Sequence, residues 1–126
     1  MITRALAVSA LLTLATTTTA AHADPTPDAW AQLRTCESGD NYTIVSTNGR
    51  YYGAYQFNLT TWRSVGGTGT PTNATPTEQD YRALYLYRMR GWQPWTCART
   101  LHLTPDADAA SHRIPTYHDS AHMGDT

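Results

Sequence analysis

Three patterns of apolar and polar residues divide the 126-residue chain. An apolar run covers residues 5–14, helical and strand-like periodicities occupy residues 28–103, and a polar stretch with few large apolar residues follows. The division predicts one folded domain at 28–103, preceded by a short Pro-rich lead-in at 24–27. Residues 104–126 are expected to form a disordered polar tail, because they offer little apolar surface to bury.

Helical spacing is clearest at the start of this domain. Trp30, Leu33 and Glu37 fall on one face of a first helix, which Asp28 is expected to cap and Gly39 to end. Asn58 is predicted to cap a second, short helix.

A third helix is expected after residue 75. Thr75-Pro76-Thr77-Glu78 has the pattern of a capping box with proline at the first helical position, and Gly91 can stop the helix that it opens. Two β-prone runs, 42–45 and 51–55, flank an Asn-Gly pair within residues 46–50, which indicates a hairpin. The predicted fold is therefore α+β, a small helix-rich domain with one β-hairpin.

The apolar run at the N-terminus has the features of an export signal. Arg4 supplies a positive charge before it, and Ala21-His22-Ala23 has the small-x-small pattern of a cleavage site. The run is half the length of the roughly 20 residues that a membrane-spanning helix needs. These features predict a signal peptide at 1–23, a secreted protein, and no stable membrane anchor after cleavage.

Charge and cysteine content narrow the function. All nine basic residues are Arg, set against ten acidic residues, and they form no concentrated basic stripe, so we expect no nucleic-acid partner. Outside the cytoplasm two thiols most simply form one disulfide, here Cys36 with Cys97. A ring of that size stabilises a small core by roughly 4 kcal/mol. A catalytic cysteine is the weaker interpretation, because His102 is the only histidine nearby in the sequence.

Glu37 is the candidate for chemistry. The chain has two glutamates, and the capping box already gives Glu78 a structural task. Glu37 precedes a run rich in tyrosine, and aromatic surroundings raise the pKa of a carboxyl group by desolvating its charged form. Such a group can act as a general acid. From the residues alone, a solvated glutamate at a helix end remains an open alternative.

Several motifs in order resemble the resuscitation-promoting factor domain. They are Cys36–Tyr42, Tyr51–Phe57, Thr61-Trp62, Gly66-Gly67, and Gly91–Trp95 with Cys97–Arg99. The resemblance implies a lysozyme-like fold related to lytic transglycosylases, in a family of secreted, cell-wall-associated actinobacterial enzymes that cut peptidoglycan.

Matched residue by residue, the resemblance implies roles for particular side chains. Glu37 is the catalytic acid, and Cys36 and Cys97 form the disulfide. The substrate-binding residues that it implies are Thr61, Gln56, Tyr52, Trp62 and Asn41, of which Tyr52 and Trp62 fit a core position as well as the cleft. The chain departs from the family pattern at Asp40, Arg50 and Tyr42. For Asp40 we favour a role in the turn over an electrostatic effect on Glu37.

The predicted mechanism uses one acid, because the other carboxylates have structural explanations. Glu37 would protonate the β-1,4 bond between N-acetylmuramic acid (MurNAc) and N-acetylglucosamine (GlcNAc), giving an anhydro or a hydrolysed product in wall remodelling or resuscitation from dormancy. The alternative is a non-catalytic peptidoglycan-binding or signalling module. We expect no cofactor and no metal, since the spacing of His112, His118 and His122 matches no zinc pattern. The expected partners are peptidoglycan strands and other cell-wall hydrolases, and the expected state is a monomer.

Overall fold

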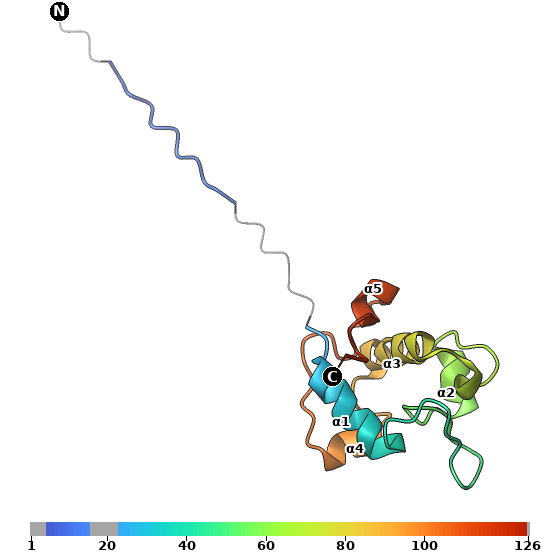
Figure 1. Cartoon of the computed structure of the whole chain (residues 1–126). Coiled ribbons are helices and arrows are strands. Elements are labelled where there is room, and N and C mark those ends of the chain that lie inside the picture. Colours follow the sequence, from blue (N-terminus) through green and yellow to red (C-terminus); the bar gives the residue numbers. More distant parts are fainter. Residues whose placement is uncertain (1–4, 16–22, 126) are drawn as a thin grey trace, which may run out of the picture.

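The computed structural model describes residues 5–15 and 23–125, and its ordered elements are helices (Figure 1). They are α1 (Pro27–Ser38), α2 (Leu59–Ser64), the 3-10 turn η1 (Pro71–Asn73), α3 (Pro76–Arg90), α4 (Thr96–Thr100) and α5 (Tyr117–Ser120). Among the described residues, β structure is limited to isolated bridges. The expected small helix-rich domain is confirmed, with less strand than the sequence suggested.

α1 begins one residue before the predicted cap. Thr26 is the N-cap, and its hydroxyl accepts a hydrogen bond from the Ala29 N–H at 3.2 Å. Pro27 takes the first helical position, where its missing N–H costs nothing. The expectation that Asp28 caps the helix was therefore wrong, and this residue lies in the first turn, where its charge suits the helix dipole. Gly39 ends α1 with φ 67°, as predicted.

The caps of α2 and α3 largely follow the sequence. The Asn58 side chain accepts from the Thr61 N–H at 2.7 Å, and the Thr75 hydroxyl accepts from the Glu78 N–H at 3.2 Å. The second half of the predicted capping box does not form. The Glu78 carboxylate instead accepts from Arg82 Nε at 2.7 Å, since an arginine one turn further on offers it a charged donor.

The core is built around the indole of Trp30, which is fully buried. Four aromatic rings meet it edge-on at centroid distances of 5.0–6.1 Å: Tyr55, Tyr87, Trp92 and Trp95. These rings come from the second β-prone run of the predicted hairpin, from α3, and from the segment before α4. One aromatic cluster thus fixes the relative positions of α1, α3 and α4.

The predicted hairpin is reduced to a turn with two single bridges. Val45 pairs with Tyr52, and Tyr52 pairs with Phe57, both antiparallel. Two backbone N–H groups that could pair the strands of a hairpin donate to side chains instead. The Tyr51 N–H donates to Ser46 Oγ at 3.0 Å, and the Arg50 N–H donates to Asn48 Oδ1 at 3.0 Å. Ser and Asn compete with strand pairing in this way.

Residues 104–125 contradict the expectation of a disordered tail. They cross α3 and end beside α1 (Figure 1). Met123 is 1% exposed, and its carbonyl accepts from Arg34 Nη1 at 2.8 Å. The Tyr117 ring stacks on Tyr81 at 3.9 Å between centroids. The few large side chains of this segment thus have partners on distant elements, which local composition does not reveal.

The predicted signal peptide lies partly outside the described residues, which omit 1–4 and 16–22. Residues 5–15 have no helix, and their leucines are exposed. In the part of the chain that the structure describes, no helix is both long and apolar enough to cross a membrane.

Candidate active site

Glu37 lies at the point where α1 meets the loop that follows the Val45–Tyr52 bridge. It is the penultimate residue of the helix and is half-buried. The next residue, Ser38, donates from Oγ to the Ala54 carbonyl at 2.8 Å. The Gly39 N–H closes the helix on the carbonyls of Arg34 and Thr35. The end of α1 is therefore held against residues 53–56, and Glu37 is held with it.

One oxygen of the Glu37 carboxyl group is fixed by the start of α4. The Cys97 N–H donates to Glu37 Oε1 at 3.3 Å. Trp95, the N-cap of α4, provides no side-chain cap, so the glutamate supplies an acceptor to this turn from a distant helix. The Cys36–Cys97 disulfide holds the two segments together, with Cα atoms 6.0 Å apart. The predicted disulfide is confirmed.

The environment favours the protonated form of this carboxyl group. Burial raises the pKa of Glu37 above its ordinary value, and the hydrogen bond from the Cys97 N–H opposes this only in part. Glu37 Oε2 has no hydrogen-bond partner among the described residues. One oxygen is thus oriented by the backbone, while the other can carry a proton to a bound molecule.

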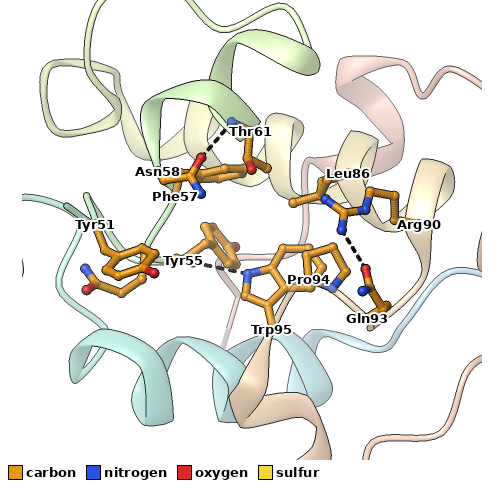
Figure 2. Close-up of a pocket in the computed structure, with 11 residues that line it drawn as sticks. Tyr51, Tyr55, Phe57, Asn58, Thr61, Leu86, Arg90, Gln93, Pro94 and Trp95 are labelled. Atoms are coloured by element: carbon orange, nitrogen blue, oxygen red, sulfur yellow. Dashed lines mark hydrogen bonds between the residues drawn. The ribbon is translucent and has the colours of Figure 1, made fainter.

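A groove of about 220 Å³ is lined by residues from 51–61 and 86–95 (Figure 2). Its aromatic base includes Tyr55 and Trp95, joined by a hydrogen bond from Trp95 Nε1 to the Tyr55 carbonyl at 3.1 Å. The lining residues are Tyr51, Tyr55, Gln56, Phe57, Asn58, Thr61, Leu86, Arg90, Gln93, Pro94 and Trp95. Rings next to polar side chains suit a sugar, which has apolar faces and hydroxyl edges.

Glu37 is not itself a lining residue of the groove. Two residues that contact Glu37 or its neighbour Ser38 are close in the sequence to lining residues. Cys97, which donates to its carboxyl group, follows the lining residue Trp95 by two positions. Ala54, which accepts from Ser38, directly precedes the lining residue Tyr55. The contacts of this end of α1 are thus made with residues that lie next to the groove lining in the sequence.

Of the five expected substrate-binding residues, two line the groove and three lie elsewhere. Gln56 and Thr61 line the groove. Tyr52 is half-buried between its two bridges, and Asn41 is exposed, where its side chain accepts from the Thr43 N–H at 3.0 Å. Trp62 is 1% exposed and does not line this groove, which fits the core position that the sequence left open for it.

Trp62 and Asp40 both have structural tasks. The Trp62 ring packs edge-on against Phe57, and its Nε1 donates to the Thr68 carbonyl. Asp40 takes the left-handed region with φ 58° and accepts from Arg34 Nε at 2.6 Å. It thus forms part of the turn and pairs with an arginine, as favoured from the sequence.

The groove also contains residues that sequence reasoning missed. Asn58 was predicted as a helix cap, and Leu86 falls within the predicted third helix. Both residues also line the groove. Arg90, Gln93 and Trp95 lie close to the Gly91 helix stop in the sequence, where the Gly91–Trp95 motif was the one signal. No group of three or more His, Cys, Asp or Glu side chains within the described ranges is placed to hold a metal ion.

Comparison with known proteins places this architecture in a family. A model of the transglycosylase-like domain matches residues 24–98. The chain is 44% identical over 86 residues to the resuscitation-promoting factor Rpf of Micrococcus luteus, a match that covers 67% of this chain and 38% of that protein. It is 40% identical over 85 residues to RpfE of Mycobacterium tuberculosis, covering 64% of this chain and 49% of the relative.

A third relative extends the match along the chain. Resuscitation-promoting factor Rpf1 of Corynebacterium glutamicum is 31% identical over 126 residues, covering 85% of this chain and 65% of that protein. Each of these matches spans less than two thirds of the relative's own length. The chain belongs to the transglycosylase-like family and carries a domain of the resuscitation-promoting factor type.

Proposed function

We propose that this chain is an exported enzyme that cleaves the β-1,4 bond between MurNAc and GlcNAc in peptidoglycan, with Glu37 as its single catalytic acid. The observation that carries the proposal is the state of the Glu37 carboxyl group. It is half-buried, its pKa is raised, and one oxygen is held by the N–H of Cys97, two residues after Trp95 of an aromatic and polar groove. Membership of the transglycosylase-like family supports the same reaction class.

In the proposed reaction the proton is used and then recovered. Glu37 donates its proton to the glycosidic oxygen as the bond from that oxygen to the muramyl C1 breaks, and positive charge develops on the sugar ring. The resulting carboxylate then takes a proton from the muramyl 6-hydroxyl, whose oxygen bonds to C1 and gives a 1,6-anhydro product. If it takes the proton from water instead, the product is a reducing-end muramyl sugar.

The surroundings favour a mechanism without a second carboxylate. Glycosidases with two carboxyl groups place them about 5–9.5 Å apart across the scissile bond. None of the eleven lining residues is acidic. Asp40, the nearest acid along the chain, is paired with Arg34. Attack by the substrate's own hydroxyl would remove the need for a protein nucleophile.

Mass spectrometry of muropeptides released from actinobacterial peptidoglycan tests the proposal. Purified wild-type protein is expected to release soluble fragments, and Glu37→Gln to lower the rate by roughly 10²–10⁴-fold, the usual contribution of a general acid. Anhydromuramyl ends would identify a lytic transglycosylase, and reducing muramyl ends a hydrolase. Binding without release by the wild type would instead identify a non-catalytic peptidoglycan-binding module.

Export is part of the proposal and rests on other observations. The segment 1–23 has the pattern of a signal peptide, and the Cys36–Cys97 disulfide suits an oxidising compartment outside the cytoplasm. N-terminal sequencing of protein recovered from the culture medium tests this assignment, and a first residue of Asp24 is expected.

A further inference from the structure

The groove contains one charged side chain, that of Arg90. The other ten lining residues are neutral. Arg90 is exposed in the last turn of α3. None of the ion pairs among the described residues includes it, whereas Arg34, Arg82 and Arg88 each have a carboxylate partner. The groove therefore presents an uncompensated positive charge.

Gln93 orients this cation without neutralising it. Arg90 Nη2 donates to Gln93 Oε1 at 2.6 Å, and both side chains line the groove (Figure 2). An amide oxygen carries no net charge, so the guanidinium remains a full cation. A guanidinium has five N–H donors, and its planar fork matches a carboxylate in two-point contact. Most of these donors remain free for a ligand.

Arg90 is also placed where an extended ligand would reach it. In Figure 2, Arg90 and Gln93 lie on one side of the groove and Tyr51 on the other, with Tyr55 and Trp95 between them. A glycan that covers the aromatic rings would thus bring its substituents toward the guanidinium. Hydroxyl and acetamido groups need no charged partner, whereas a carboxylate gains most from one.

We propose that Arg90, held by Gln93, is a specificity-determining residue that binds a carboxylate of the glycan substrate. This inference rests on the proposed function, since it takes the groove as the peptidoglycan site. Peptidoglycan offers a carboxylate from two sources: the lactyl group of muramic acid where the peptide has been removed, and the stem peptide where it is retained. The ligand chemistry is the same in both, and an all-GlcNAc oligomer lacks it.

Binding measurements in the Glu37→Gln background test this without cleavage of the ligand. Isothermal titration would use three oligosaccharides of equal length: all-GlcNAc, alternating GlcNAc and MurNAc with free lactyl groups, and the same polymer with stem peptides. Adding Arg90→Gln is expected to weaken binding of a carboxylate-bearing ligand about five- to tenfold, typical of a partly exposed charged contact. Binding of the all-GlcNAc ligand should change less than about twofold, within the effect of a surface substitution.

The pattern of losses identifies the source of the carboxylate. A loss confined to the ligand with free lactyl groups assigns that group, and a loss confined to the peptide-bearing ligand assigns the stem. Higher salt should shrink either difference, because exposed charges are screened. Arg99→Gln is the matched control, since Arg99 is exposed on α4 and outside the groove lining. It should leave all three affinities unchanged.

Three outcomes would overturn the inference: equal weakening for neutral and anionic ligands, no weakening for any ligand, or no binding of any ligand by Glu37→Gln. Failure of the proposed function gives a different result, because wild-type protein would then release no muropeptides while the charge-selective loss of binding persisted. Circular dichroism melts of Arg90→Gln check that the exposed substitution leaves the fold intact.

Discussion

Glu37 supplies a hydrogen-bond acceptor that the first turn of α4 otherwise lacks, so it has a structural contact as well as a proposed chemical role. The raised pKa of its carboxyl group was expected from the sequence. The contact with the Cys97 N–H was not, because it joins residues 60 positions apart. The structural contact explains why Oε1 is fixed, while the raised pKa makes the group suitable as an acid.

The raised pKa of Glu37 predicts the direction of two pH effects. As a general acid Glu37 must be protonated, so cleavage should fall as pH rises through its pKa, which burial raises above the ordinary value of a glutamate. Its folded-state pKa exceeds the unfolded one, so the stability it contributes is present below the unfolded pKa and is lost as pH rises through the folded pKa. Release of dye-labelled peptidoglycan against pH measures the first effect, and urea unfolding against pH the second.

Glu37→Gln provides the control for both effects. Glutamine keeps an oxygen for the Cys97 N–H but does not titrate, so the variant should be more stable than wild type above the raised pKa and similar to it at low pH. A wild-type rate that is flat across this range, or equal pH dependence of stability in the two proteins, would contradict the assignment.

Arg34 marks the limit of sequence reasoning at this scale. The first helix was assigned a face of Trp30, Leu33 and Glu37, but Arg34 is also buried, at 1% exposed. It is compensated by Asp40, by the Tyr55 hydroxyl at 3.1 Å and by the Met123 carbonyl at 2.8 Å. A buried cation needs such partners, and these come from three separate segments that helical periodicity does not connect.

At the scale of elements, the helix ends could be predicted and the long-range contacts could not. The glycine stops at Gly39 and Gly91 and the caps at Asn58 and Thr75 depend on residues within one turn, so local sequence determines them. The hairpin depends on competition from the side chains of Ser46 and Asn48, whereas the C-terminal segment depends on partners far away in the sequence. Apolar content alone therefore indicated disorder for residues 104–125, where the structure has α5 and a buried methionine.

Met123 tests whether this segment belongs to the folded unit. Met123→Ala removes a fully buried side chain that packs in the core cluster, and it should lower the free energy of unfolding by about 2–4 kcal/mol. Ile114→Ala is the matched control on the same segment, because Ile114 is 64% exposed and its loss should cost less than about 0.5 kcal/mol. Denaturant unfolding measures both. Equal stability of the two variants would show that the segment does not pack on the domain in solution.

At the scale of the whole molecule, one covalent link joins the end of α1 that carries Glu37, the proposed acid, to the last part of the domain. The Cys36–Cys97 disulfide spans 61 residues, and α1 and α4 are in contact at this point. Cys36 directly precedes Glu37 in the sequence, and the backbone N–H of Cys97 donates to the Glu37 carboxyl group. Stability and the position of the acid are therefore coupled through the same residues.

Replacing both cysteines by serine tests this coupling. The loss of a ring of this size should cost roughly 4 kcal/mol of unfolding free energy, and the cleavage rate should fall further than the folded fraction, since Cys97 and its N–H are then less firmly held beside Glu37. Unfolding and muropeptide release would be measured on the same preparations, at a temperature where circular dichroism reports a folded variant. Dithiothreitol should lower both quantities in wild type and neither in the double variant. A fully active folded variant would mean that packing around Trp30 alone is sufficient to position the acid.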